Sequence, residues 1–242
     1  MVSFPSAPDD LFKAYAYEQL ATIGKALCAP ARLVILNVLC QGERTVEVLA
    51  GHAGLSVANA SQHLQVLRRA NLVESERQGN KIIYRVADRN VVGFFTSMKE
   101  LAAERMSSLQ VAFSEISAAP SRLAAVGREE LLSLVEAGIA VVIDVRPSEE
   151  YRSGHIAGTV SIPLDRLSDH LSWLPADKEI VALCRGSYCI LADKAVDILR
   201  ELGLSARRAI DGVVEWELSG LPVERETGQR LEASVEGDHG GQ

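Results

Sequence analysis

The stretch that decides the fold of the N-terminal half reads TVEVLAGHAGLSVANASQHLQVLRRANLVESERQGNKIIYRVA, residues 45–87. Two short helical patterns lie on either side of a glycine-containing turn, and Ser56 is a strong N-cap for the second of them. Polar and apolar residues then alternate on both sides of Gly79-Asn80, which predicts a β-hairpin. Helix, turn, helix and hairpin in this order are typical of a winged helix-turn-helix.

The second helix of this pair has the two faces that a DNA-reading helix needs. Val57, Ala60, Leu64 and Leu67 recur at helical spacing and predict a buried face, while short polar side chains occupy the opposite face. Such polar side chains can reach base edges, and the arginines that follow them suit phosphates. The predicted DNA-contacting residues are Ser56, Asn59, Ser61, Gln62, His63, Gln65, Arg68, Arg69, Arg77, Asn80 and Lys81. The alternative is a generic helical domain whose polar face is merely solvated.

Further helices are predicted before and after this motif. Apolar residues recur close to a helical period over 11–27, fill most of 31–40, and recur over 91–113 as one long fifth helix. Cys28 and Cys40 lie in apolar parts of these helices, so both are predicted to be small buried side chains. The alternative role for these two cysteines is that of a thiol sensor.

Residues 18–105 resemble the arsenic-repressor (ArsR/SmtB) family of winged-helix repressors, above all in the string SQHLQVLRRANLV, residues 61–73. The resemblance implies a homodimer formed through the first and fifth helices, binding to double-stranded operator DNA, and a signal that releases the DNA. Many family members carry a cysteine pair in the third helix or histidine ligands on the fifth. The third helix here, ERTVEVLA (residues 43–50), has no cysteine and the fifth helix has no histidine, so no metal site is predicted.

The C-terminal half alternates between strand and helix patterns. Residues 140–145 and 179–184 are short apolar strands, 191–203 is a helical pattern ended by a glycine, and 206–210 is a further strand. Strands that alternate with helices favour an α/β domain with a parallel sheet.

The second of these strands leads into a cysteine-containing loop, LCRGSYC, and Cys184 stands where the strand ends. A cysteine here can be a buried filler, a metal ligand, half of a disulfide or a nucleophile. At the carboxyl end of a parallel strand it lies at the rim where α/β folds bind ligands. Backbone amides wrapped around the sulfur, together with the start of the next helix, would stabilise a thiolate. Gly186 permits the sharp turn, and Arg185 adds a positive charge for an anionic sulfur donor.

Residues 122–225 resemble the rhodanese family, in the strings VIDVRPSEEYRSGHIAGTVSIP (142–163) and DGVVEWELSGLPVE (211–224) and in the cysteine loop. The resemblance implies that Cys184 accepts a sulfane sulfur as a persulfide. The substrate-binding loop would then consist of Arg185, Gly186, Ser187, Tyr188 and Cys189. Asp144, Arg146 and His155 match motif positions that are mainly structural in that family.

Two features of the loop depart from the rhodanese pattern. Glycine is third rather than fourth, and Cys189 occupies the sixth position. Cys189 can be a small residue that begins the helix, or it can attack a persulfide on Cys184, expel sulfide and leave a disulfide. The fold is shared with dual-specificity phosphatases, but their clamping arginine is replaced by Ile190, which argues against a phosphatase.

Composition and charge set the outer limits. The chain has 242 residues, 48% apolar content and a net charge of −7, as expected for a globular protein. Residues 1–115 carry 12 basic and 11 acidic residues, whereas 116–242 carry 13 and 21, so only the first half tolerates a polyanion. The sequence shows neither a secretory signal nor a membrane span, which predicts a cytoplasmic protein without a membrane partner and with mainly reduced cysteines.

Together these patterns predict a mainly-α winged helix-turn-helix domain over 1–117, an α/β rhodanese-like domain over 118–226 and a disordered tail over 227–242. The predicted function is that of a DNA-binding regulator, a repressor, that takes sulfane sulfur onto Cys184 from thiosulfate, polysulfide or a persulfide. One alternative is a sulfurtransferase enzyme whose DNA-binding half only autoregulates its operon. Another is a repressor that responds to arsenite through thiol pairs. No cofactor is predicted.

Overall fold

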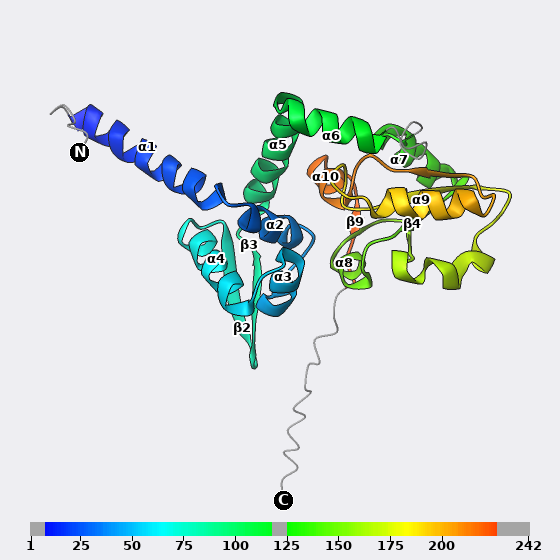
Figure 1. Ribbon diagram of the computed structural model, residues 1–242, viewed down its shortest axis with the longest axis horizontal. Coiled ribbons are helices and arrows are strands. Elements are labelled where there is room, and N and C mark those ends of the chain that lie inside the picture. The colour runs from blue at the N-terminus through cyan, green and yellow to red at the C-terminus, as the bar shows by residue number, and fades with distance from the viewer. Residues whose placement is uncertain (1–7, 118–124, 227–242) are drawn as a thin grey trace, which may run out of the picture.

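The computed structural model describes residues 8–117 and 125–226, which form two units connected through α5 and α6 (Figure 1). The N-terminal unit contains α1 (Pro8–Leu27), α2 (Pro30–Leu39), β1 (Arg44–Thr45), α3 (Val46–Ala53), α4 (Val57–Arg69), β2 (Val73–Gln78), β3 (Lys81–Val86), α5 (Arg89–Arg105) and α6 (Ser107–Ser117). The C-terminal unit contains α7 (Arg128–Ala137), β4 (Ala140–Asp144), α8 (Ser148–Ser153), β5 (His155–Ile156), β6 (Val160–Ser161), the 3₁₀ helix η1 (Leu164–Trp173), β7 (Glu179–Leu183), α9 (Leu191–Glu201), β8 (Ala206–Arg208), α10 (Val213–Leu218) and β9 (Val223–Glu224). This is the predicted fold class. The predicted domain boundary at 117/118 adjoins residues 118–124, which lie outside the described residues. The predicted tail over 227–242 also lies outside them.

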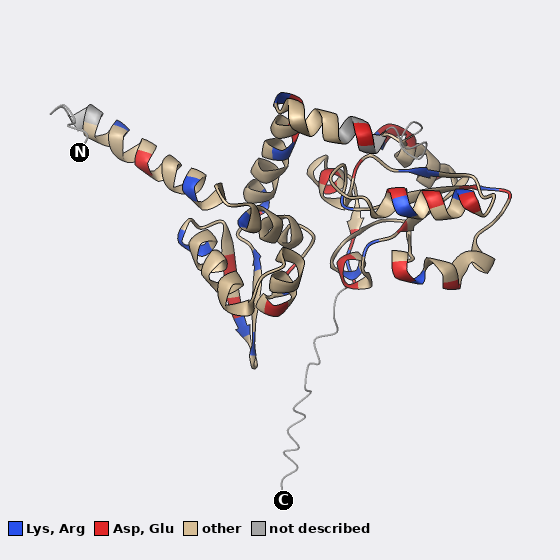
Figure 2. Ribbon diagram, in the orientation of Figure 1, with Lys and Arg blue, Asp and Glu red and all other residues tan. Residues whose placement is uncertain are grey.

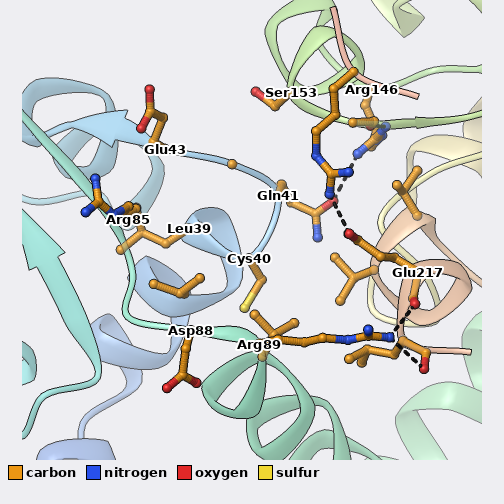
Figure 3. Close-up of a pocket in the computed structure, with 18 residues that line it drawn as sticks. Leu39, Cys40, Gln41, Glu43, Arg85, Asp88, Arg89, Arg146, Ser153 and Glu217 are labelled. Carbon is orange, nitrogen blue, oxygen red and sulfur yellow. Dashed lines mark hydrogen bonds and ion pairs between the residues drawn. The ribbon is translucent and has the colours of Figure 1, made fainter. Parts of the chain in front are cut away.

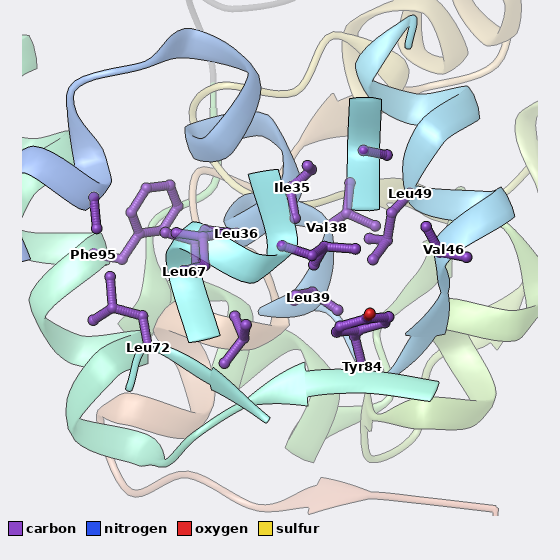
Figure 4. Packing of buried hydrophobic residues seen from close by; sticks show 14 of the residues in the cluster. Ile35, Leu36, Val38, Leu39, Val46, Leu49, Leu67, Leu72, Tyr84 and Phe95 are labelled. Carbon is purple, nitrogen blue, oxygen red and sulfur yellow. The ribbon is translucent and has the colours of Figure 1, made fainter. Parts of the chain in front are cut away.

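The N-terminal unit is built around one apolar core (Figure 4). Ile35 and Leu36 of α2 pack with Leu49 of α3 and Leu67 of α4, and all four are at most 1% exposed. The predicted inner face of α4 is confirmed for Ala60, Leu64 and Leu67, which are fully buried. It is wrong for Val57, which is 45% exposed because it lies in the first turn, where the helix leaves the core.

The helix cap and the hairpin form as the sequence predicts. The Ser56 hydroxyl accepts a hydrogen bond from the Asn59 amide at 3.3 Å and so caps α4. β2 and β3 pair antiparallel up to Gln78 and Lys81, and Gly79 in the turn has a φ of +63°. β1 adds a third strand, and Figure 2 shows Lys and Arg on the β2–β3 hairpin.

The prediction of one continuous fifth helix over 91–113 is wrong. The helix is interrupted at Met106, whose backbone is extended (φ −95°, ψ 102°), and the chain continues as α6 in a new direction (Figure 1). The apolar residues keep a helical spacing along the sequence through both α5 and α6. Only Met106 leaves the helical backbone conformation, so this spacing does not reveal that the chain changes direction there.

A four-stranded parallel sheet forms the centre of the C-terminal unit, with the order β6-β4-β7-β8. Successive residues of β7 face opposite sides, as in any strand. Ile180 and Ala182 pack in the cluster that includes α9 and η1, and Val181 and Leu183 pack in the cluster that includes α7 and α10. Both faces of the sheet are therefore covered, and the carboxyl end of β7 opens onto the cysteine loop.

No single helix within the described residues combines the length and the hydropathy of a membrane span. The segments Leu11–Leu27 and Pro30–Leu39 have the required length and hydropathy only when they are counted as one segment, and they are bent by 89° relative to each other.

Candidate functional site

The cysteine loop, residues 184–190, connects β7 to α9. Cys184 and Cys189 are joined as a disulfide with their Cα atoms 6.3 Å apart, and their exposed fractions are 2% and 7%. The expectation of mainly reduced cysteines is therefore wrong for this pair. The physical reason is the turn at Gly186, which folds the loop back so that the two sulfur atoms meet.

The backbone of the loop depends on two glycines. Gly186 has a φ of +89°, a left-handed conformation that favours glycine, and its carbonyl accepts a hydrogen bond from the Cys189 amide at 3.1 Å. Gly212, which precedes α10, lies so close that a Cβ atom there would be 2.6 Å from the Arg185 carbonyl carbon and from the Gly186 nitrogen. In this disulfide form, no backbone amide of a described residue donates to Cys184 Sγ, so the amide cradle stays a prediction for the reduced loop.

The guanidinium of Arg185 is held by Glu150 of α8. Its Nε and Nη2 atoms donate to the two carboxylate oxygens of Glu150 at 2.7 and 2.6 Å, and Glu150 is only 2% exposed. A bidentate pair of this kind fixes the guanidinium in position. Glu150 could not be predicted from the sequence, because it stands beside Glu149 and only the fold shows which of the two is buried.

A second buried ion pair supports the loop from β8. Arg208 is 4% exposed, its Nη1 lies 3.5 Å from Asp193 Oδ2, and its Nη2 donates to the Gly186 carbonyl at 3.4 Å. Asp193 belongs to the first turn of α9, so this pair ties the helix, the loop and the sheet together.

Asp144, Arg146 and His155 brace the neighbouring strand end. The Arg146 side chain donates to both carboxylate oxygens of Asp144 and, through Nη2, to the Gly154 carbonyl at 2.8 Å. His155 stacks on Tyr151 with ring centroids 3.8 Å apart. None of these contacts involves the cysteine sulfurs.

The cysteine loop also touches the winged-helix unit directly, at what we call the α5 junction: Phe95, Lys99, Tyr188 and Glu215. The Tyr188 hydroxyl donates to the Lys99 backbone carbonyl of α5 at 2.7 Å. The Lys99 ammonium lies 3.5 Å from a Glu215 carboxylate oxygen and over the rings of Phe95 and Tyr188. Glu215 in turn accepts from the Gly212 amide at 3.1 Å, so the junction continues to the glycine that supports the loop.

A cavity of about 390 Å³ lies between the two units, with Cys40 in its wall (Figure 3). Gln41 accepts a hydrogen bond from Arg146 at 3.1 Å, and Arg89 donates to the Glu217 carbonyl at 2.7 Å, so contacts between the units border the cavity. Burial raises the pKa of the Cys40 thiol to about 12, and the opposing charges of Lys99 and Glu215 modify it less. Cys40 is therefore a protonated thiol at neutral pH and a weak nucleophile.

Cys28 differs from its predicted state. It is exposed at the end of α1, where its thiol donates to the Lys25 carbonyl at 3.1 Å. The prediction of a buried side chain is wrong because α1 ends at Leu27 and Cys28 stands in the short link to α2.

The predicted DNA-contacting residues gather on α4 and the hairpin. Ser61 and His63 are half-buried, and the exposed members are Ser56, Asn59, Gln62, Gln65, Arg68, Arg69, Arg77, Asn80 and Lys81. The Arg68 guanidinium donates to the Ser75 hydroxyl at 3.2 Å and so connects α4 to β2. Arg85, on the opposite hairpin strand, is paired with Glu74 and Glu76, so it is less available to phosphates.

Two family descriptions match separate parts of the chain. Residues 29–75 match the bacterial regulatory proteins of the arsR family, and residues 127–219 match the rhodanese-like domain. The chain belongs to the arsR-family HTH-type transcriptional regulators and carries a C-terminal rhodanese-like domain.

Among its relatives is the HTH-type transcriptional regulator Rv0324 of Mycobacterium tuberculosis, 43% identical over 212 residues, which are 88% of this chain and 93% of the relative. The uncharacterized HTH-type transcriptional regulator Rv0081 of the same organism is 34% identical over 106 residues, 43% of this chain and 93% of that protein. A solved homodimeric winged helix-turn-helix DNA-binding domain, Mb0332 of Mycobacterium bovis, is 37% identical, covers 44% of this chain and 94% of its own, and has a TM-score of 0.38.

Proposed function

We propose that this regulator is a homodimeric repressor whose affinity for operator DNA depends on the sulfur chemistry of Cys184 and Cys189. The observation that carries the proposal is the direct contact between the cysteine loop and α5, through the Tyr188 hydroxyl and the Lys99 carbonyl.

Exposed surfaces support the DNA and dimer parts of the proposal. Most of the predicted DNA-contacting side chains of α4, and Arg77, Asn80 and Lys81 of the hairpin, are exposed to solvent, as base and phosphate contacts require. Large apolar side chains are also exposed on both helices that the family resemblance assigns to the dimer. They are Leu11, Phe12, Tyr15, Tyr17 and Leu20 of α1, and Phe94 and Leu101 of α5. An apolar surface of this kind is typical of an interface.

The chemistry starts from the reduced loop. The Cys184 thiolate attacks the sulfane sulfur of a donor, the sulfur–sulfur bond of the donor breaks, and the rest of the donor leaves with the bonding electron pair, as sulfite where the donor is thiosulfate and as a thiolate where it is a persulfide. The product is a persulfide on Cys184. The Cys189 thiolate then attacks Sγ of Cys184, hydrosulfide leaves with the bonding pair, and a disulfide forms. The bonded pair Cys184–Cys189 in the structure supports this second step, because the loop accommodates its product.

The α5 junction gives the sulfur state a route to the DNA-binding unit. Tyr188 precedes Cys189, so closing or opening the disulfide acts on the residue that holds the Lys99 carbonyl. α5 follows directly on β3 of the hairpin and carries part of the proposed dimer surface. A change at Tyr188 therefore acts through α5 on the hairpin and on the proposed dimer surface, which together set the spacing of the DNA-reading helices.

The test is a fluorescence anisotropy titration with DNA taken from upstream of the gene. Wild type, Cys184→Ser and Cys28→Ser are each measured after reduction and after treatment with polysulfide. We expect polysulfide to change the affinity of wild type and of Cys28→Ser, and to leave Cys184→Ser unchanged. Equal affinities in all six measurements would refute the coupling, and rapid sulfur turnover without any change in affinity would instead favour the sulfurtransferase alternative.

A further inference from the structure

Each of three cations around the cysteine loop is matched by its own carboxylate. Arg185 is paired with Glu150, Arg208 with Asp193, and Lys99 with Glu215. All six side chains are at most 19% exposed, so water screens the pairs weakly. The loop is therefore close to neutral, although three basic residues surround it.

The pair between Arg185 and Glu150 matters most, because Arg185 is part of the loop itself. Both carboxylate oxygens of Glu150 are engaged by the guanidinium, and Glu150 has an exposed fraction of 2%. If Arg185 turned away to bind a donor anion, the Glu150 charge would be left buried without its partner, which is strongly unfavourable. Arg185 is thus held in place with its charge neutralised by Glu150, and its remaining Nη1 group lies 4.0 Å from Cys189 Sγ.

The net charge of the C-terminal half also disfavours the binding of a dianionic donor. Residues 116–242 carry 21 acidic and 13 basic residues, so a small dianion approaches against a net charge of −8. Thiosulfate approaches as a dianion and releases sulfite as a dianion, so positive charge near the loop would favour both its approach and the departure of the leaving group. A protonated hydropersulfide, R–S–SH, presents an uncharged terminal sulfur and releases a thiolate with a single negative charge, so it depends less on positive charge at the loop.

We infer that the loop takes its sulfur from low-molecular-weight hydropersulfides rather than from thiosulfate, and that Glu150 sets this preference. This inference rests on the proposed sulfur loading of Cys184. In the step, the Cys184 thiolate attacks the terminal sulfur of R–S–SH, the sulfur–sulfur bond breaks, and the thiolate RS⁻ leaves with the electron pair. Cys184 then carries the persulfide as Sγ–SH, and no external oxidant or reductant is consumed.

The test compares Glu150→Gln with Glu149→Gln, its matched control. Both changes remove one negative charge from α8, but Glu149 is exposed and its side chain makes no contact with the loop. The reduced proteins are mixed with thiosulfate or with cysteine persulfide, and the rate at which Cys184 gains one sulfur is followed by mass spectrometry. We expect wild type and Glu149→Gln to load much faster from cysteine persulfide. We expect Glu150→Gln to gain about tenfold with thiosulfate, since one uncompensated charge acts at short range, and to change about twofold or less with the persulfide.

Ionic strength gives a second readout that needs no variant. A neutral loop predicts that added salt, by screening the acidic surface, leaves the wild-type thiosulfate rate unchanged or raises it, whereas an open cation would make that rate fall. Equal wild-type rates from thiosulfate and persulfide, or a wild-type thiosulfate rate that falls with salt, would overturn this inference alone. Failure of both donors to load Cys184 would overturn the proposed function, and this inference with it.

Discussion

The winged-helix unit and the rhodanese-like unit hold their cysteines in opposite ways. Cys40, which follows the last residue of α2, stands in the wall of the cavity between the units as a lone thiol, and burial raises its pKa to about 12. Cys184 and Cys189 are buried more deeply than Cys40, yet their loop brings them together as a bonded pair. The difference teaches that burial alone does not decide the chemistry of a thiol, because the backbone around the pair determines whether a second sulfur is within reach.

The two units also differ in the surfaces and loops that carry the proposed function. The C-terminal unit contains the cysteine loop, and the N-terminal unit presents the polar face of α4. The α5 junction contacts both, through the Tyr188 hydroxyl and the Lys99 carbonyl. Perturbations of the loop, of the junction and of Cys40 should therefore have effects of decreasing size.

The largest effect is expected from Gly212→Ala, which places a methyl group against the backbone of the cysteine loop. The new Cβ would lie 2.6 Å from backbone atoms of Arg185 and Gly186, so the loop or α10 must move. We expect a loss of about 1–3 kcal/mol in the free energy of unfolding, as for other overpacked sites, and a much slower formation of the Cys184 persulfide. Urea unfolding and mass spectrometry measure the two effects.

Gly127→Ala is the control for this change. Gly127 has an ordinary φ of −75° and open space around its Cα, so an added methyl group meets nothing within 4 Å. A Gly212→Ala protein that matches this control in stability and in sulfur loading would contradict the role assigned to the close approach.

A smaller effect is expected from Tyr188→Phe, which removes only the hydroxyl at the α5 junction. The contact between the units loses one hydrogen bond, an effect of about 1 kcal/mol. We expect sulfur loading of Cys184 to be unchanged and the polysulfide-induced change in operator affinity to shrink severalfold. Stopped-flow loading and anisotropy titrations separate the two readouts.

Tyr151→Phe controls for the loss of a tyrosine hydroxyl. The Tyr151 hydroxyl donates to the Thr159 carbonyl at the same distance of 2.7 Å, but both residues belong to the C-terminal unit. If both variants respond to polysulfide as wild type does, the junction does not carry the coupling.

Local patterns in the sequence predicted much of this structure. The Ser56 cap, the Gly79-Asn80 turn and the strand that leads to Cys184 depend on neighbours a few residues away, so spacing reveals them. The break at Met106 was missed, because one extended residue leaves the apolar period intact.

Contacts between distant segments could not be read from spacing. Tyr188 and Lys99 are 89 positions apart, and Glu150 and Arg185 are 35 apart, so only the packed fold brings them together. Gly212 carries no side chain whose chemistry would mark it, and its importance follows from a close approach of two backbones. The position of the cysteine loop was thus predictable from the sequence, but its ion-pair partner Glu150 and its contact with α5 were not.

The smallest effect is expected at Cys40 and is seen only at high pH. Its pKa in the folded protein is raised from about 9.0 to about 12, so the buried thiol favours folding fully below pH 9.0, and this contribution is lost as the pH rises toward 12. We expect unfolding by urea to become easier across that window in wild type, and less so in Cys40→Ala. In the same proteins, iodoacetamide should modify the exposed Cys28 well before Cys40 at about pH 8, because only a thiolate reacts. Equal labelling of the two cysteines at that pH would show that Cys40 is an accessible thiolate, and the contrast between the two units would fail.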